Sequence, residues 1–294
     1  MQQMEIISET GVWRDEFEGR VLAGYRDAGC SEPLARALLE QAVKGIDGWT
    51  VATDGAGWAA VEVREEDGAL VGRIHDLTTP RGREWAERWC AERGAQRVAV
   101  RLTGAAGAFA DYPVRAQNRM RAVAEAPELP AGLTARRLTE DEYPDWLAGE
   151  QAGYVADMVR AGAMTPEQAK AKSDRDFARL LPQGYATPGH AFYAMEAEGV
   201  VVGTGWVNHA FLPGVTFGFS LEVYEEHRGK GYGRAAMAVG AWATRQGGDE
   251  VLMLNVFGGN DVAMGLYESA GFTVLEEYRS IDLDPRLDPV PAPA

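Results

Sequence analysis

The second half of the chain shows helical and strand-like patterns of apolar and polar residues in a regular order. A short strand pattern precedes two helical patterns, and each helix begins with a threonine cap and a proline near its first turn. Three strand patterns follow, separated by Glu-Gly and Pro-Gly turns as in a meander of hairpins. The predicted order is a strand at 133–138, helices at 139–162 and 165–181, three strands within 190–223, an alanine-rich helix ending near 243, a strand at 250–257, a helix at 260–271 and a strand at 272–283.

The first half repeats this order in a weaker form. Its predicted elements are helices at 11–29 and 31–45, strands at 49–55, 58–66 and 69–77, a helix at 80–94, and strands at 96–102 and 112–124. Two features of the second half are missing: the glycine-rich loop before the alanine-rich helix, and the helix of 260–271, whose place is taken by the short segment 103–111. We therefore predict a divergent tandem duplication.

A segment rich in proline and small residues, 124–133, separates the two halves and is typical of an exposed linker. We predict an α+β protein with a degenerate first domain at 1–128, a second domain at 129–284 and a disordered proline-rich tail at 285–294. Each domain is expected to hold a mixed, mostly antiparallel sheet flanked by helices.

Composition narrows the classes of partner. The 294 residues carry a formal charge of -15, which opposes binding to nucleic acid or anionic membranes and favours cationic partners. Two cysteines and four histidines without ligand spacing predict neither a disulfide framework nor a metal site. No signal peptide or membrane span is recognisable, so we expect a cytoplasmic protein, a monomer or homodimer.

The stretch "LEVYEEHRGKGYGRAAMAVGAWA", residues 221–243, leads from a strand through three glycines into a helix. Glycine allows positive φ and close approach of a ligand to the backbone. Successive N–H groups of such a turn, together with those of the helix that follows, form a concave site for phosphate. A plain turn without a ligand is an equally good explanation of this loop alone. The residues concerned are Arg228, Gly229, Lys230, Gly231, Tyr232, Gly233 and Arg234.

A second pattern, "NDVAMGLYESAGF" at 260–272, places Asn260 at a helix cap and Tyr267 on the same helical face. Together the two patterns resemble the GNAT superfamily of N-acetyltransferases, whose members carry Arg/Gln-x-x-Gly-x-Gly/Ala in the acetyl-CoA loop and Asn-x-x-Ala-x-x-Leu-Tyr-x-x-x-Gly-Phe in a later helix. The resemblance covers about residues 131–284. The first half resembles this fold only in element order and has neither motif.

The resemblance implies roles for these residues. Backbone groups at Leu221 and Val223 would bind the pantetheine arm of acetyl-CoA or another acyl-CoA and polarise the thioester. The 228–234 loop would hold the pyrophosphate, Asn260 would contact pantetheine, and Tyr267 would protonate the departing thiolate. We expect direct attack by an amine, and at most one CoA per chain because the first half lacks the loop.

The general base is open at this level. Strand alternation places Glu222 opposite in direction to Leu221 and Val223, so that Glu222 and Asn255 would point together toward the acceptor. Glu222 is the candidate base, and an ordinary solvated carboxylate is nearly as good an interpretation. His209 is a weaker candidate. Aromatic residues of the first helix, Tyr143, Trp146 and Tyr154, are acceptor-pocket candidates for which core packing is the better explanation.

The predicted activity is transfer of an acetyl or other acyl group from CoA to an amine of a small molecule, an antibiotic or a peptide. One alternative is a carrier-protein or longer acyl-CoA donor in natural-product biosynthesis, although an intact pyrophosphate loop favours free acyl-CoA. Another is a CoA-binding or interaction protein without catalysis. Tandem members of the resembled superfamily include mycothiol synthases and antibiotic-modifying or self-resistance enzymes, and the residues do not select among them.

Overall fold

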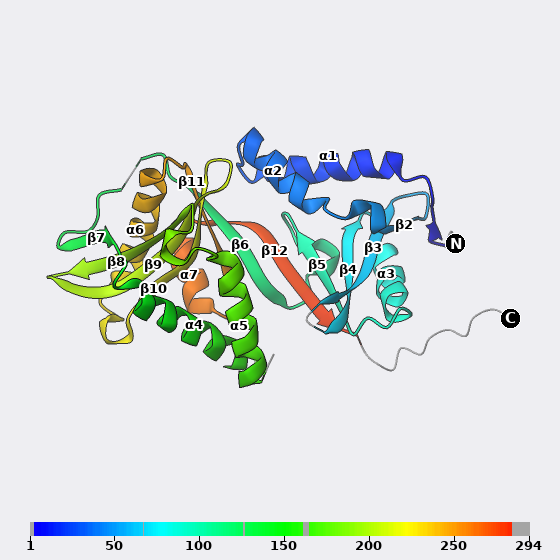
Figure 1. Cartoon of the computed structure of the whole chain (residues 1–294). Helices are drawn as coiled ribbons and strands as arrows, with labels where there is room; N and C mark the ends of the chain where they lie inside the picture. The colour runs from blue at the N-terminus through cyan, green and yellow to red at the C-terminus, as the bar shows by residue number, and fades with distance from the viewer. Residues whose placement is uncertain (1–2, 67, 126, 161–164, 284–294) are drawn as a thin grey trace. The chain divides into compact units, whose positions relative to one another are not determined.

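The computed structural model describes residues 3–66, 68–125, 127–160 and 165–283. The chain divides into two units (Figure 1). The first unit consists of Met1–Arg121 and Leu254–Ala294, and the second of Ala122–Met253. The predicted tail at 285–294 lies outside the described residues.

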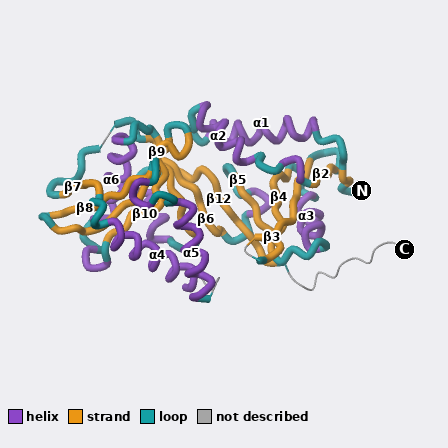
Figure 2. Tube along the Cα trace, viewed as in Figure 1, coloured by secondary structure: helices purple, strands orange, loops and turns teal. Residues whose placement is uncertain are grey.

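The helices and strands of the first unit follow the predicted order closely (Figure 2). A 3₁₀ turn, η2, lies in the segment 103–111, for which no helix was predicted. In chain order they are β1 (Glu5–Ile6), α1 (Gly11–Asp27), α2 (Glu32–Ala42), η1 (Ile46–Gly48), β2 (Thr50–Thr53), β3 (Trp58–Glu66), β4 (Ala69–Leu77), α3 (Gly82–Ala91), β5 (Arg97–Leu102), η2 (Gly107–Phe109), β6 (Val114–Ala122), α7 (Asp261–Ser269) and β12 (Thr273–Asp282).

The sheet of the first unit has the order β1-β2-β3-β4-β5-β12-β6. Strands β4 and β5 are parallel from Val71↔Arg97 to Ile74↔Val100, whereas β12 is antiparallel to both β5 and β6. The last strand of the chain therefore completes the sheet of the first unit. The boundary predicted near residue 128 separates two copies of one element order. The two units are defined by contacts within the structure, so they do not test this boundary, which stays a prediction.

Alternation along β3 explains how helices cover both faces of this sheet. Ala60 packs with Trp13 of α1 in one apolar cluster, and its neighbour Val61 packs with Ala86 of α3 in another. Successive side chains of a strand point to opposite faces, so each face needs its own helices. The first unit thus has helix, sheet and helix layers (Figure 1).

The second unit repeats the same arrangement. A β7-β8-β9-β10 meander carries the aromatic cluster around Phe192 and Trp146 on the α4 and α5 face, and Tyr193 packs with Ala243 of α6 on the other face. Its elements are β7 (Leu133–Arg137), α4 (Tyr143–Arg160), α5 (Pro166–Leu180), η3 (Gly184–Ala186), β8 (His190–Ala197), β9 (Val200–Leu212), β10 (Val215–Val223), η4 (Glu225–His227) and α6 (Tyr232–Gln246), with β11 (Val251–Phe257) spanning the boundary of the two units.

Helix starts in the second unit follow the sequence signals. At α5, Thr165 Oγ1 accepts from the Gln168 N–H and the Gln168 side chain accepts from the Thr165 N–H, so the capping box is complete. Pro144 is the second residue of α4, where a missing N–H costs little. The predicted fold class, α+β with one element order repeated in tandem, is confirmed.

Candidate functional site

The glycine-rich loop of the second unit joins β10 to α6. Gly229 and Gly231 have φ of 75° and 88°, and a side chain at either position would meet no atom within 4 Å. The backbone N–H groups of residues 229 to 233 donate to no acceptor within the described part of the chain. The loop therefore presents a row of free N–H groups at a helix N-terminus, which is a site for an anion.

Basic side chains surround this row. Arg228, Lys230 and Arg234 are exposed, while Tyr232 and Gly233 are half-buried. The Arg228 Nε atom donates to the Val223 carbonyl oxygen at 3.1 Å and so fixes the entry to the loop. In the described ranges, no carboxylate pairs with Lys230 or Arg234. These cations add long-range attraction for a polyanion to the short-range N–H donors.

The strand that leads into the loop is held closely by its neighbour. Leu221 and Val223 of β10 pair with Gly205 and Gly203 of β9. A β-carbon at Gly203 would overlap the Glu222 carbonyl oxygen, so only glycine permits this approach. The backbone of Leu221 and Val223 is thus placed by β9, and their side chains are half-buried.

The structure reveals a carboxylate that the sequence analysis missed. Glu150 lies on α4, and its Oε1 atom accepts from Ser220 Oγ of β10 at 2.7 Å. Burial raises the pKa of Glu150 to about 7, the Ser220 hydrogen bond opposes this rise, and the charge of Glu222 adds to it. A carboxyl group with a pKa near neutrality is suited to proton transfer at physiological pH. No sequence signal marked Glu150 apart from its place on a helix that covers β10.

The side chain of Glu222 is more exposed to solvent than that of Glu150. Its side chain is about 50% exposed, and its Oε1 atom lies 3.8 Å from Arg228. The predicted role of Glu222 as base and its predicted alignment with Asn255 stay predictions. The charge of Glu222 also raises the pKa of Tyr224, after the larger effect of burial. Glu222 therefore acts electrostatically on both neighbours.

The remaining candidates of the second unit have structural roles. His209 Nδ1 lies 2.9 Å from Thr216 Oγ1, and burial lowers its pKa despite the nearby charge of Asp249. Tyr143 and Trp146 belong to the buried aromatic cluster on the sheet. Packing is the role that their burial supports.

The second motif lies in the first unit, on α7. Asn260 caps this helix, with Oδ1 accepting from the Ala263 N–H at 3.1 Å. Tyr267 packs against Phe272 with ring centroids 5.7 Å apart, and the Phe272 N–H closes the turn onto the Tyr267 carbonyl. Burial raises the pKa of Tyr267, with a smaller opposing effect of Arg119, so its phenol keeps its proton at neutral pH.

The described residues contain no group of three or more histidine, cysteine, aspartate or glutamate side chains that could hold a metal ion. None of the helices in these ranges is long and apolar enough to cross a membrane.

Comparisons with known proteins relate the chain to acetyltransferases. Residues 157–272 match the acetyltransferase (GNAT) family. The chain is 35% identical over 137 residues to the "Uncharacterized N-acetyltransferase YycN" of Bacillus subtilis, covering 45% of this chain and 86% of that protein. It is 32% identical over 215 residues to a mycothiol acetyltransferase of Thermobispora bispora, covering 69% of this chain and 68% of that one.

A solved structure extends the comparison to nearly the whole chain. A GCN5-related N-acetyltransferase from Sphaerobacter thermophilus aligns with a TM-score of 0.51 and 20% identity, over 91% of this chain and 94% of that structure, and this likeness concerns the fold. Family membership rests on the sequence matches and on the two motifs whose geometry is described above. The chain belongs to the GNAT family of acetyltransferases.

Proposed function

We propose that the protein transfers an acetyl group from acetyl-CoA to the amine of a small molecule. The observation that carries this proposal is the row of free N–H groups at residues 229 to 233, with Arg228, Lys230 and Arg234 around it. Such a donor set fits a pyrophosphate, because charge-assisted hydrogen bonds to backbone N–H groups neutralise it without a metal ion.

The resemblance to GNAT enzymes assigns the other motif residues to the rest of the CoA molecule. The backbone groups of Leu221 and Val223 are assigned to the pantetheine arm and the thioester carbonyl. The Asn260 Oδ1 atom is used in capping α7, which leaves its amide N–H groups to donate to pantetheine. The acyl-CoA supplies the activated acetyl group.

Glu150 is the base that we assign to the amine. It accepts the proton, directly or through water, as the nitrogen forms its bond to the acetyl carbon and the carbon–sulfur bond breaks. A pKa of about 7 keeps Glu150 partly deprotonated at neutral pH. The carboxylates of Glu150 and Glu222 also attract a cationic ammonium group, as expected for an amine acceptor.

Tyr267 holds the proton that the departing thiolate takes, and its raised pKa keeps the phenol in the required form. No cysteine suits a covalent intermediate, because burial raises the thiol pKa of Cys30 to about 11 and of Cys90 to about 12. Direct attack by the amine is the route that these groups support.

The names of the relatives bear on the acceptor. The Thermobispora bispora relative is named for mycothiol, a small molecule, and this favours a small-molecule amine over a peptide amine. A longer acyl-CoA, a carrier-protein donor, and CoA binding without catalysis are the competing proposals. A free pyrophosphate site argues against the carrier protein, which presents pantetheine without the adenine nucleotide.

The test is a thiol-release assay with acetyl-CoA and a panel of small-molecule amines, aminoglycosides and peptides. We expect release of CoA thiol that depends on one class of small amine, with the N-acetylated product identified by mass spectrometry. Turnover with longer acyl-CoA but not acetyl-CoA would redirect the donor. CoA binding without turnover of any donor would support the non-catalytic alternative.

A further inference from the structure

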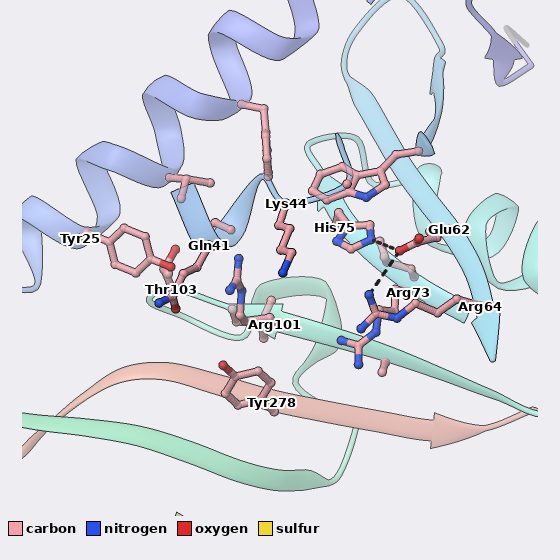
Figure 3. Close-up of a pocket in the computed structure, with 18 residues that line it drawn as sticks. Tyr25, Gln41, Lys44, Glu62, Arg64, Arg73, His75, Arg101, Thr103 and Tyr278 are labelled. Atoms are coloured by element: carbon pink, nitrogen blue, oxygen red, sulfur yellow. Dashed lines mark hydrogen bonds and ion pairs between the residues drawn. The ribbon is translucent and has the colours of Figure 1, made fainter. Parts of the chain in front are cut away.

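The first unit contains a cavity of about 700 Å³ between its helices and its sheet (Figure 3). The α1 helix and the connection from α2 to η1 form one side, and β3, β4, β5 and β12 form the other. A cavity of this size holds a metabolite-sized molecule. The motif residues 228–234, Asn260 and Tyr267 are absent from its lining.

The lining combines an apolar side with a strongly basic side. Phe17, Val21 and Trp49 supply the apolar surface, and the Trp49 ring stacks on His75 at a centroid distance of 3.6 Å. Four cationic side chains line the cavity, against one carboxylate, Glu62: Lys44, Arg64, Arg73 and Arg101. Such a concentration of positive charge is unexpected in a chain with a formal charge of -15.

Three of the four cations have acidic partners. Arg73 and Arg64 both bind Glu66, at 2.8 Å for Arg73 Nη2 and 2.7 Å for Arg64 Nε. Arg101 Nη1 lies 3.7 Å from the buried Glu276. These pairs hold the basic wall in place and reduce its charge.

Lys44 differs from the arginines. Among the described residues, no carboxylate or hydrogen-bond acceptor pairs with its Nζ atom, and the side chain points into the cavity (Figure 3). The side chains of Gln41 and Thr103, which also line the cavity, likewise have no hydrogen-bond partner in the described ranges. Lys44 and Gln41 are exposed and Thr103 is half-buried, so one cation and two donor groups face the cavity from its solvent-open side.

His75 is an uncharged part of the cavity wall. Its pKa is lowered to about 3, mainly by burial and further by the charges of Arg73, Arg101 and Arg64. The ring is neutral at physiological pH, so it adds a flat surface and no charge of its own. Its Nε2 atom lies 3.2 Å from Glu62 Oε2, the carboxylate of the lining.

We propose that this cavity binds a small organic molecule carrying one anionic group, a carboxylate or a phosphate, at Lys44, with its apolar body against Phe17 and Trp49. One unpaired cation matches one anionic group, and Gln41 and Thr103 donate to the remaining oxygens. This site is separate from the acetyl-CoA loop and gives the first unit a ligand of its own.

The probes are benzoate and phenyl phosphate, with benzamide as the neutral control, titrated into the full chain by calorimetry. We expect at least one anion to bind with a Kd of about 1 mM or tighter, more weakly as salt increases, and benzamide not to bind. Comparison of the two anions identifies the anionic group. If neither anion binds at about 10 mM, or benzamide binds equally well, the proposal is wrong.

The position of the ligand is tested with variants and with the histidine ring signals in proton NMR. Lys44→Met should weaken anion binding about tenfold or more, Lys44→Arg should retain it, and Arg81→Gln, which removes an exposed charge of the same unit, should change nothing. Ligand should shift the ring signal of His75, assigned with His75→Gln. Loss of binding on saturation with acetyl-CoA, or Lys44→Met behaving like Arg81→Gln, would overturn the assignment.

A measurement of acetyl transfer distinguishes a failure of this proposal from a failure of the proposed function. Lys44→Met should leave acetyl-CoA binding and thiol release unchanged, since Lys44 lies outside the assigned catalytic and CoA-binding residues. A protein that lacks acetyltransferase activity would still test the cavity through calorimetry and the His75 signal.

Discussion

The connection from β4 to α3 in the first unit and the connection from β10 to α6 in the second occupy the same place in the element order but have opposite chemistry. In the first unit, Thr79 Oγ1 donates to the Asp54 carboxylate at 2.7 Å, and Asp54 also accepts from two backbone N–H groups. The backbone donors are Ala56 and Gly57 of the β2–β3 turn, and the hydrogen bonds lower the pKa of Asp54, so it stays charged beside Thr79 of the connection. In the second unit, the N–H groups of residues 229 to 233 are free.

This difference illustrates how one copy of a fold can keep its architecture without the phosphate site proposed for the other. The charged Asp54 carboxylate is bound by the β2–β3 turn and meets the β4–α3 connection through Thr79, where it repels an anion. The β4–α3 connection spans only 78–81 and includes Pro80, whereas the β10–α6 connection spans 224–231 and includes Gly229 and Gly231 at positive φ. The function proposed for the second unit depends on groups left unpaired.

The largest effect is expected from Glu150, which tests whether the second unit supplies the base of the proposed reaction. Glu150→Gln should lower kcat about 100-fold or more, because the amide cannot accept the proton. In the wild type, kcat should fall below pH about 7 as Glu150 becomes protonated, and the variant should lack this limb. The pH dependence of thiol release measures both.

The control for Glu150 is Glu16→Gln on α1, the corresponding first helix of the first unit, where the carboxylate accepts from Trp58 Nε1. This variant should keep the wild-type rate. Burial of the Glu150 charge opposes folding above pH 7, so Glu150→Gln should unfold at a Tm no lower than the wild type at pH 8. An unchanged rate in Glu150→Gln would place the base elsewhere.

The second test concerns the glycine loop. Gly231→Val should raise the Kd of acetyl-CoA roughly 10- to 100-fold, since a branched residue at a φ of 88° displaces the N–H groups that hold the pyrophosphate. Gly199→Val, at a φ of 79° in a hairpin of the same unit, carries a similar backbone strain without touching the loop. Calorimetry should give one acetyl-CoA per wild-type chain. Two tight sites would mean that the β4–α3 connection also binds acetyl-CoA, against the difference described above.

The sequence predicted the element order well because the local signals were strong. Capping at Thr165, the glycine turns and strand alternation are all local, and each lies where the structure has the corresponding boundary. The partners of β12 were not accessible, since a strand pattern does not say which sheet receives it. Glu150 was missed for a similar reason: its raised pKa arises from burial beside Ser220, a residue distant in the chain.

A third, smaller effect is expected at Tyr267. Tyr267→Phe should lower kcat about tenfold with little change in the Kd of acetyl-CoA, because a thiolate is a fair leaving group that needs only modest help from an acid. The ring contact with Phe272 should survive, so stability should change little. An unchanged kcat would remove the acid role, and a weaker Kd alone would make Tyr267 a binding residue.

The smallest effect is expected from Glu222, the carboxylate that the sequence favoured as base. Its charge raises the pKa of Glu150, so Glu222→Gln should lower that pKa and move the acidic limb of the pH–rate profile down by about half a pH unit, with kcat at pH 8 unchanged. Raising the salt concentration to about 0.5 M should also lower the pKa of Glu150 in the wild type, because salt screens the charge of Glu222, which is half exposed. A loss of about tenfold or more at every pH would instead make Glu222 the base and Glu150 its buried neighbour.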